Sequence, residues 1–495
     1  DAVGELALLT GEPRAASVRA ARTTDLLAVY RDDFDELLLA APALPLALSR
    51  TLAGQLREMR GPARSTRPRP TTIAVLAAER GLPSDAIASG LAAALARHLD
   101  VALLGSRDAP PSANGSDPAA IYGPLLDRAE GRHDLVVLDA GAAPDDDGWT
   151  GFCLQQADRI LVLAAGGPLP AALADRHELH GCDLVAYDVA PGSGALEGVA
   201  AALDPVETHV LRPQELDADL ARLARRVAGR SVGIVLSGGG ARAFSHIGVL
   251  EELVAAGVTI DRVAGVSMGS FVGALFAMGL DAEEIDARCF EEWVQRRPLG
   301  DYTLPRHALI RGERARAMLD RTFGTLAIEE LPRSFMSGST ELRSGRLSVA
   351  RWGPLYEAVG FSVCLPVVAP PQVRGRELFI DGSLVDNLPV HVMADMGEGP
   401  VIAVDVKPTS ERPDGAPRPS AATPRTPRLG ETLTRVLLLG SANTSEAARR
   451  HADLVITPRA EGVSLLEFHQ LDVARAAGRV AAREALEKAP SVLFT

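Results

Sequence analysis

The sequence predicts an α/β fold made of two successive layers of parallel strands covered by helices. Between residues 72 and 228, short apolar runs rich in Val, Ile and Leu alternate with amphipathic helical segments, which is typical of a doubly wound α/β layer. From residue 229 to 406 the alternation begins again. Its first segment is SVGIVLSGGGARAFSHIGVL (231–250), where an apolar strand meets three glycines and then a helical pattern.

The first unit contains five runs that read as buried parallel strands and one clear amphipathic helix. We expect the strands at 71–78, 100–106, 134–141, 159–167 and 182–188, and the helix at 85–99. The unit has no GxxxxGK[ST] motif, and the loop AERGLPSD after its first strand offers no glycine cradle. These features favour a structural spacer over a nucleotide site.

The second unit has a longer series of strands and ends, after a Pro/Ser/Thr-rich linker, in a helical segment. We expect strands at 234–236, 262–266, 336–340, 347–350, 377–380, 400–406 and 453–460, and a final helix at 470–489. The apolar stripe Val473, Ala477, Val480 and Leu486 predicts the core-facing side of that helix.

Composition and charge exclude some classes of partner. The chain has 495 residues, 47% of them hydrophobic, which is enough for two to four domains. Its net charge of −13 argues against nucleic acid as a partner and against general electrostatic adhesion to anionic lipid. Any membrane contact should therefore be local and apolar. The longest nearly uncharged run (265–280) is shorter than the roughly 20 residues that a spanning helix needs.

Four cysteines are spread along the chain and form no CxxC pair: Cys153, Cys182, Cys289 and Cys364. This spacing fits buried thiols in a reducing compartment. We therefore expect a cytoplasmic protein, free or peripheral on the inner face of the membrane.

The glycine-rich loop fits either a dinucleotide site or an oxyanion site. Gly238, Gly240 and Ala243 satisfy G-x-G-x-x-A, and Asp261 follows about 20 residues later. However, Asp261 precedes the next strand, whereas the ribose-binding acid of a dinucleotide site follows it. Ser267 stands at that position instead, which favours the oxyanion interpretation.

Ser267 lies in GVSMG (265–269), a G-x-S-x-G between a predicted strand and a predicted helix, as a nucleophile elbow requires. Its base could be one of the histidines downstream of the glycines: His246, His307, His391, His451 or His469. None of them lies in an evident motif, and we expect His246 to pack under the loop or bond its backbone. Asp381, at the end of a strand and before a turn, is the stronger candidate, although Asp-Gly alone is an ordinary turn.

The three motifs GGGAR (238–242), GVSMG (265–269) and DGS with NLP (381–389) together resemble the patatin-like phospholipase family. The resemblance implies a three-layer α/β/α catalytic domain with a serine–aspartate dyad and no required cofactor or metal. In it Ser267 is the nucleophile and Asp381 the general base. Gly238, Gly239 and Gly240 supply the oxyanion hole, and Arg242 positions their loop.

Two stretches depart from the family pattern, namely Ser383 in the third position of D-G-G and GFSVCLP (360–366). We expect them to change the shape of the pocket and to leave the dyad intact.

Five apolar residues could line an acyl channel, although we expect at least half of them to pack in the core instead: Phe271, Leu275, Phe276, Phe361 and Leu365.

The N-terminal stretch GELALLTGEPRAASVRA (4–20) resembles the phosphate-binding cassette of cyclic-nucleotide-binding domains. The resemblance implies a partial β-roll in which Glu5 binds the ribose, Arg14 the cyclic phosphate, and Ala15 adds a backbone N–H. A helix at 31–42 would follow the cassette. Cyclic AMP or cyclic GMP would then be an effector; the alternative is a β-roll remnant without a ligand.

The order of modules resembles the neuropathy target esterase family and its bacterial relatives. We expect these segments: 1–60, the cyclic-nucleotide-binding-like part; 61–71, a linker; 72–228, the spacer; 229–406, the catalytic domain; 407–430, a second linker; and 431–495, a part packing on the catalytic domain. The resemblance implies a lysophospholipase or phospholipase with a lipid substrate. The alternative is a nucleotide-sensing scaffold with a degenerate patatin domain, and the oligomeric state stays open.

Overall fold

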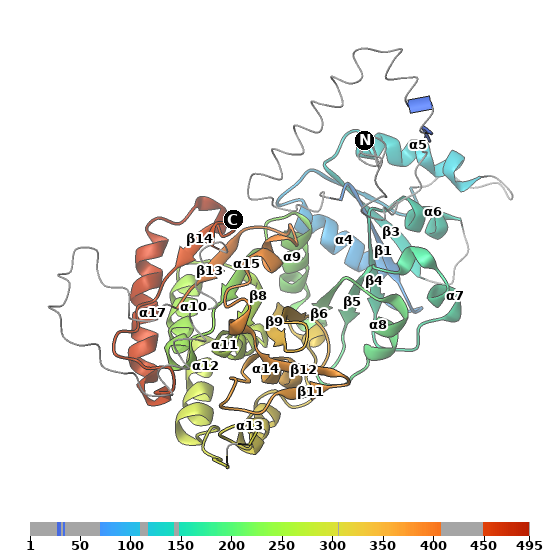
Figure 1. Cartoon of the computed structure of the whole chain (residues 1–495). Helices are drawn as coiled ribbons and strands as arrows, with labels where there is room; N and C mark the ends of the chain where they lie inside the picture. Colours follow the sequence, from blue (N-terminus) through green and yellow to red (C-terminus); the bar gives the residue numbers. More distant parts are fainter. Residues whose placement is uncertain are drawn as a thin grey trace.

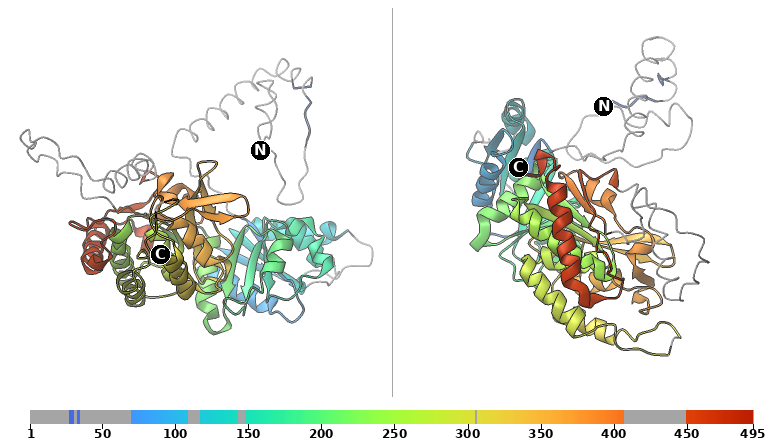
Figure 2. Two further views of the ribbon diagram at one scale, coloured as in Figure 1. Left: turned by 60° about the horizontal axis from the view of Figure 1, so that its bottom comes forward. Right: turned by 90° about the vertical axis from the view of Figure 1, so that its left-hand side faces the viewer.

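The computed structural model describes residues 27–30, 33–34, 70–108, 117–142, 148–304, 306–406 and 449–494 (Figure 1). Several predicted features lie outside these residues: Glu5, Arg14 and Ala15, the β-roll around them, most of the helix at 31–42, and nearly all of both linkers. Two sheets, each with its own helices, lie side by side (Figure 2).

The first sheet has six parallel strands in the order β2-β3-β1-β4-β5-β6. Its strands are β1 (Thr72–Ala77), β2 (Val101–Leu104), β3 (Leu135–Ala142), β4 (Arg159–Ala164), β5 (Asp183–Tyr187) and β6 (Glu207–Leu211). Five match the predicted runs, and β6 was not predicted. The central strand β1 is buried along its whole length, as expected for a parallel strand between two helical layers.

Helices cover both faces of this sheet. Ile73 and Val75 of β1 face one core, whereas Ala74 and Leu76 face the other, because side chains alternate along a strand. The first core is closed by α4 (Ser84–Leu95) and α9 (Leu216–Val227). The second is closed by α5 (Pro118–Glu130), α6 (Trp149–Gln156), α7 (Ala171–Ala174) and α8 (Glu197–Leu203).

The second sheet has eight strands in the order β11-β12-β9-β8-β7-β13-β14, with β10 on β9. They are β7 (Val232–Leu236), β8 (Ile260–Val266), β9 (Ser334–Glu341), β10 (Arg346–Ala350), β11 (Gln372–Arg374), β12 (Glu377–Asp381), β13 (Val401–Val404) and β14 (Leu454–Ile456). The five consecutive strands β9-β8-β7-β13-β14 are parallel, whereas β10, β11 and β12 add antiparallel pairs. Of the eight, only β11 was not predicted.

Helices on both faces make this unit a three-layer α/β/α structure, as predicted. One face carries α10 (Ser245–Ala255), α11 (Met268–Ala277), α12 (Ala282–Cys289), α13 (Glu313–Phe323), α14 (Leu355–Ser362) and α17 (Leu471–Leu486). The other face is covered by α15 (Val390–Ala394) and its flanking residues.

The predicted core stripe of α17 is partly wrong. Val473 and Val480 are 51% and 56% exposed, while the buried residues of the helix are Leu471, Ala474, Gly478 and Ala482. A Cβ at Gly478 would collide with the carbonyl of Ser245 on α10, so the two helices approach closely through small side chains. Close approach therefore selects the small face of α17 for the core, not the face with the larger apolar residues.

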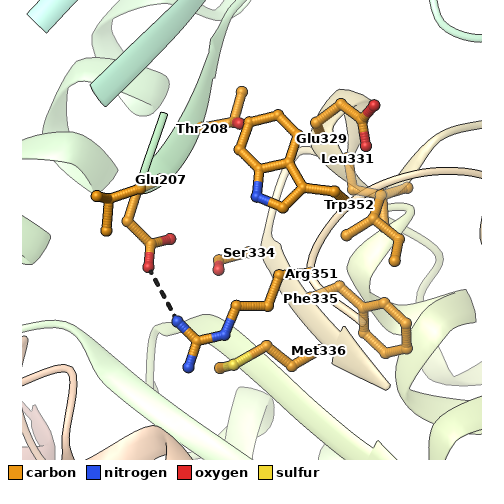
Figure 3. Close-up of a pocket in the computed structure, with 11 residues that line it drawn as sticks. Glu207, Thr208, Glu329, Leu331, Ser334, Phe335, Met336, Arg351 and Trp352 are labelled. Carbon is orange, nitrogen blue, oxygen red and sulfur yellow. Dashed lines mark ion pairs between the residues drawn. The ribbon is translucent and has the colours of Figure 1, made fainter. Parts of the chain in front are cut away.

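A cluster of buried charges joins the two units. Arg226 of α9 bonds Glu207 of β6 (2.8 Å) and Glu398, which lies just before β13 (2.7 Å). Near this cluster, a cavity of about 370 Å³ lies between β6 and the start of β9, and the Arg351–Glu207 ion pair (3.6 Å) spans it (Figure 3). Ion pairs between buried or half-buried side chains thus connect the two units.

Within the described ranges, the structure contains no helix that is both long and apolar enough to cross a membrane.

Candidate active site

Ser267 sits on a sharp turn between β8 and α11. Its backbone has φ 55° and ψ −129°, a strained conformation for a residue other than glycine. The turn is possible because glycines stand two positions before and after the serine: a Cβ at Gly265 would collide with the carbonyl of Gly269, and a Cβ at Gly269 with the carbonyl of Leu236. The turn therefore presents the Ser267 hydroxyl at the N-terminus of α11, as the G-x-S-x-G motif predicts.

The register of β9 brings Asp381 to the serine. Val266, the last residue of β8, pairs with Gly338 of β9, and the next β9 residue, Ser339, pairs with Asp381. Strand β10 pairs along the opposite edge of β9. Strands β8 and β12 therefore pair with successive parts of the same edge of β9, and their C-terminal ends meet there. Two residues 114 positions apart in the sequence, Ser267 and Asp381, thus become neighbours.

The Ser267 hydroxyl donates a hydrogen bond to Oδ2 of Asp381 at 2.6 Å. The other carboxylate oxygen, Oδ1, accepts the backbone N–H of Ser383 at 2.9 Å, so the carboxylate is held from both sides. Asp381 is completely buried, and burial raises its pKa above the ordinary value for an aspartate. A raised pKa makes its carboxylate a better proton acceptor than an exposed one.

Ser362 fixes the backbone of the nucleophile. Its Oγ accepts the N–H of Ser267 at 2.8 Å and donates to the carbonyl of Gly338 at 2.6 Å. The turn that carries Ser267 is therefore tied to β9, the strand that also positions Asp381.

Among the described residues, the hydroxyl of Ser267 has no histidine partner. His246 packs beneath the glycine loop, where its Nε2 donates to the carbonyl of Ser237 at 2.8 Å, as the sequence predicted. Burial lowers the pKa of His246 to about 4, so the ring is neutral near pH 7. Among the described residues, the side-chain partner of the Ser267 hydroxyl is therefore the carboxylate of Asp381.

The glycine loop follows β7 and lines the same site. The N–H of Gly238 is already donated to Oδ1 of Asn387 at 3.0 Å, and Nδ2 of Asn387 donates back to the Gly238 carbonyl at 3.3 Å. In the part of the chain described, no acceptor pairs with the N–H groups of Gly239 and Gly240. Gly238 is thus anchored by Asn387, and the donors left for an oxyanion are those of Gly239 and Gly240.

Arg242 is buried behind this loop, with its Nε directed at the carbonyl of Gly239 (3.4 Å). No carboxylate pairs with it in the described ranges, and burial lowers its pKa. An uncompensated cation beside the loop adds positive potential where negative charge would develop.

A cleft of about 680 Å³ opens above Ser267, and most of its lining is apolar. The residues that line it, apart from Ser267 and the three glycines, are Met268, Trp293, Leu299, Val363, Leu365, Val368, Ala369, Ser383, Asn387, Leu465, Leu466 and Phe468. Trp293 and Phe468 stack with ring centroids 4.8 Å apart. The cleft has the shape and chemistry to hold an acyl chain.

Of the five residues considered for an acyl channel, only Leu365 lines this cleft. Phe271, Leu275 and Phe276 are buried in the main core, and Phe361 stacks on Phe379. This agrees with the expectation that most of them pack in the core.

Sequence reasoning missed four residues of the site. Ser362 lies in GFSVCLP, which was expected to change the shape of the pocket, and Asn387 lies in NLP, which contributed to the family resemblance, but neither residue was assigned a role of its own. Trp293 and Phe468 had no signal beyond being aromatic. Within the described ranges, no group of three or more His, Cys, Asp or Glu residues could hold a metal ion.

Comparisons with known proteins agree with this architecture. A family profile described as "Patatin-like phospholipase" matches residues 234–394. An uncharacterized NTE family protein of Mycobacterium tuberculosis is 36% identical over 520 residues, covering 100% of this chain and 85% of that protein. "Lysophospholipase NTE1" of Cryptococcus neoformans var. neoformans is 28% identical over 487 residues, covering 82% of this chain and 29% of that protein.

Among solved structures, VipD from Legionella pneumophila aligns with 52% of this chain and 67% of its own, at 14% identity and a TM-score of 0.32, which is too weak to extend the fold description. The mycobacterial similarity spans the whole chain, and the patatin profile spans both Ser267 and Asp381. The chain therefore belongs to the neuropathy target esterase (NTE) family of patatin-like phospholipases.

Proposed function

We propose that this protein is a serine esterase that hydrolyses acyl esters of lysophospholipids or phospholipids. The observation that carries the proposal is the 2.6 Å hydrogen bond from the Ser267 hydroxyl to the buried Asp381, at the base of an apolar cleft. The family supports a lipid ester as the substrate, since the profile is that of phospholipases and one relative is called a lysophospholipase.

In the proposed reaction, Asp381 takes the proton of the Ser267 hydroxyl as the oxygen attacks the acyl carbonyl. The N–H groups of Gly239 and Gly240 stabilise the resulting oxyanion, each worth about 2.7–4 kcal/mol in comparable sites. The protonated Asp381 then protonates the leaving alkoxide. Water attacks the acyl-serine with Asp381 again as base, which releases the fatty acid and restores the enzyme. These steps use only side chains and backbone of this chain and water.

The test is hydrolysis of p-nitrophenyl butyrate and of a lysophosphatidylcholine by the wild-type chain and by Ser267→Ala. We expect the variant to lose at least about 10⁴-fold in kcat, because the nucleophile is absent. Ser344→Ala, an exposed serine in the turn after β9, should retain full turnover. Near wild-type turnover by Ser267→Ala would refute the mechanism.

We also propose that residues 1–60 bind a cyclic nucleotide through Glu5, Arg14 and Ala15. The support is the cassette-like sequence GELALLTGEPRAASVRA, in which Arg14 offers a planar set of donors for a phosphate. Titration calorimetry of the full chain with cyclic AMP and cyclic GMP tests this. Binding that Arg14→Ala abolishes is expected, and no heat with either nucleotide would contradict it.

A further inference from the structure

Four exposed apolar side chains gather at the mouth of the catalytic cleft. Tyr302 and Leu304 are 76% and 83% exposed, and Leu309 and Val367 are 41% and 47% exposed. These four residues are called the cleft rim below. Single exposed hydrophobic residues are ordinary, whereas a group of them beside an apolar cleft marks an interaction site.

Backbone hydrogen bonds connect the cleft rim to the wall of the cleft. The N–H of Leu309 donates to the carbonyl of Val367 at 2.9 Å, and that of Ile310 to Val368 at 3.0 Å. Val368 lines the cleft, as does Leu299, which lies just before the rim segment. The cleft rim therefore adjoins the wall of the cleft. The segment that carries Tyr302, Leu304 and Leu309 precedes α13, which lies at the end of the catalytic unit away from the first sheet (Figure 1).

Val367 is held in an unusual conformation at this edge. Its φ is 68°, which is rare for a β-branched residue and is retained only where the surrounding structure enforces it. The neighbouring residue Val368 lines the cleft, whereas Val367 is half exposed. The backbone strain is thus located where the cleft wall becomes the outer surface.

A cluster of positive charge surrounds the cleft rim. Residues 296–316 contain six arginines and two carboxylates, although the whole chain has a net charge of −13. Arg296 pairs with Glu291. The other five arginines are exposed and have no ion-pair partner among the described residues: Arg297, Arg306, Arg311, Arg314 and Arg316. They form the basic belt, whose charge complements an anionic surface.

We propose that the cleft rim and the basic belt dock the protein on an anionic phospholipid surface. The apolar side chains would enter the region between headgroups and acyl chains, and the arginines would lie at the headgroups. An acyl chain could then pass from the lipid layer directly into the apolar cleft that holds Ser267. The proposal rests on the proposed function and adds the route by which its substrate enters.

The test is co-sedimentation of the full chain with vesicles of mixed phosphatidylcholine and phosphatidylglycerol. We expect the wild type to pellet, and the double variant Tyr302→Ser/Leu304→Ser to bind at least about tenfold more weakly, because two apolar side chains no longer leave water. Arg306→Ala/Arg311→Ala should weaken binding about tenfold on the mixed vesicles, with little effect on pure phosphatidylcholine.

The matched control is Val254→Ser. Val254 is 52% exposed but lies at the C-terminal end of α10, whereas the glycine loop of the site leads into the N-terminal end of that helix, so this variant should bind like the wild type. All variants should hydrolyse p-nitrophenyl butyrate normally, because neither the cleft rim nor the basic belt lines the cleft.

Two results would overturn the docking proposal: wild-type protein that stays in the supernatant, or equal binding by the wild type and the cleft-rim variant. If the cleft-rim variant instead loses self-association with unchanged vesicle binding, the surface pairs two copies and the proposal is wrong. Failure of docking would leave soluble-ester turnover intact, whereas failure of the proposed function would abolish turnover of both substrates.

Discussion

The two sheets of the molecule have similar architecture but differ at the loops that follow their central strands. In the first sheet, the strand order reverses between β1 and β4, where a doubly wound sheet usually binds its ligand. Here the loop after β4 contains Gly166 and Gly167, yet the N–H of Gly167 is donated to the carboxylate of Glu79, which follows β1 (3.1 Å). The Glu79 carboxylate of the protein itself therefore accepts the backbone N–H that could otherwise bind an anionic ligand.

In the second sheet, the loop after β7 keeps two donors free. Asn387 satisfies Gly238 and leaves the N–H groups of Gly239 and Gly240 without an intramolecular acceptor in the described structure. Ser267 follows the next strand, β8, and the pairing of β12 with β9 places Asp381 beside it. The difference shows that a glycine loop at the end of a parallel strand becomes a candidate site only where its donors are unpaired and reactive side chains converge on them.

Replacing Asp381 should have the largest effect. We expect Asp381→Asn to lower kcat by about 10³- to 10⁴-fold, because the isosteric amide cannot accept the serine proton.

The same Asp381→Asn variant should be more stable than the wild type near pH 7. Burial raises the folded-state pKa of Asp381 above its unfolded value, so stability falls as pH rises above the unfolded-state pKa, and the loss is complete above the folded-state pKa. Thermal unfolding at pH 7 and at pH 4 checks this; the gain should shrink at the lower pH.

An active Asp381→Asn variant with unchanged stability would contradict both expectations. The carboxylate would then be neither a base nor a buried charge that opposes folding.

Breaking the junction between the two sheets should have the next largest effect. Arg226 is buried between Glu207 and Glu398, and we expect Arg226→Met to destabilise the protein by about 3–5 kcal/mol, because two carboxylates lose their main partner. Arg483→Met removes an exposed pair with Glu252 and should leave stability almost unchanged. Urea denaturation of both variants measures the contrast, and equal stabilities would show that the junction does not depend on this cluster.

Asn387 tests whether the glycine loop must be anchored. Asn387→Ala removes both hydrogen bonds to Gly238, and we expect kcat to fall about 100-fold through misplacement of the donors, with KM for a short ester little changed. A rise in KM at constant kcat would instead assign Asn387 to substrate binding. Steady-state kinetics with p-nitrophenyl butyrate separate the two.

Replacing Glu79 should have the smallest effect on catalysis. Glu79→Ala frees the N–H of Gly167 in the first sheet, far from Ser267, and we expect kcat/KM to change by less than about twofold, as for surface substitutions away from a site. A tenfold loss would show that the first sheet takes part in catalysis and would remove the contrast between the two sheets.

The sequence predicted most of the architecture because parallel strands buried on both faces are continuous apolar runs. It missed β6 because Glu207 and His209 of that strand are buried in the charged junction, so the run does not look apolar. It misjudged α17 because close contact with α10 favours Ala474 and Gly478 over the larger Val473 and Val480. Such choices depend on the distance between helices, which no local pattern contains.

At the candidate site, the motifs were enough to select Ser267, Asp381 and the glycine loop, because each follows a strand in a recognisable turn. They could not show that Asn387 occupies the donor of Gly238, or that Ser362 holds the N–H of Ser267. Both contacts join residues distant in the sequence, 149 and 95 positions apart, and arise only from strand register.

Activation of Ser267 by Asp381 is tested most directly by the rate at which a fluorophosphonate probe labels Ser267 as a function of pH. We predict that the wild type is labelled at Ser267 only. The rate should rise with pH through one ionisation above the usual aspartate pKa, since burial raises the pKa of Asp381. Folded Asp381→Asn should label at least about 10³-fold more slowly. Equal labelling of the two proteins, or no labelling of a folded wild type, would show that Asp381 does not activate Ser267.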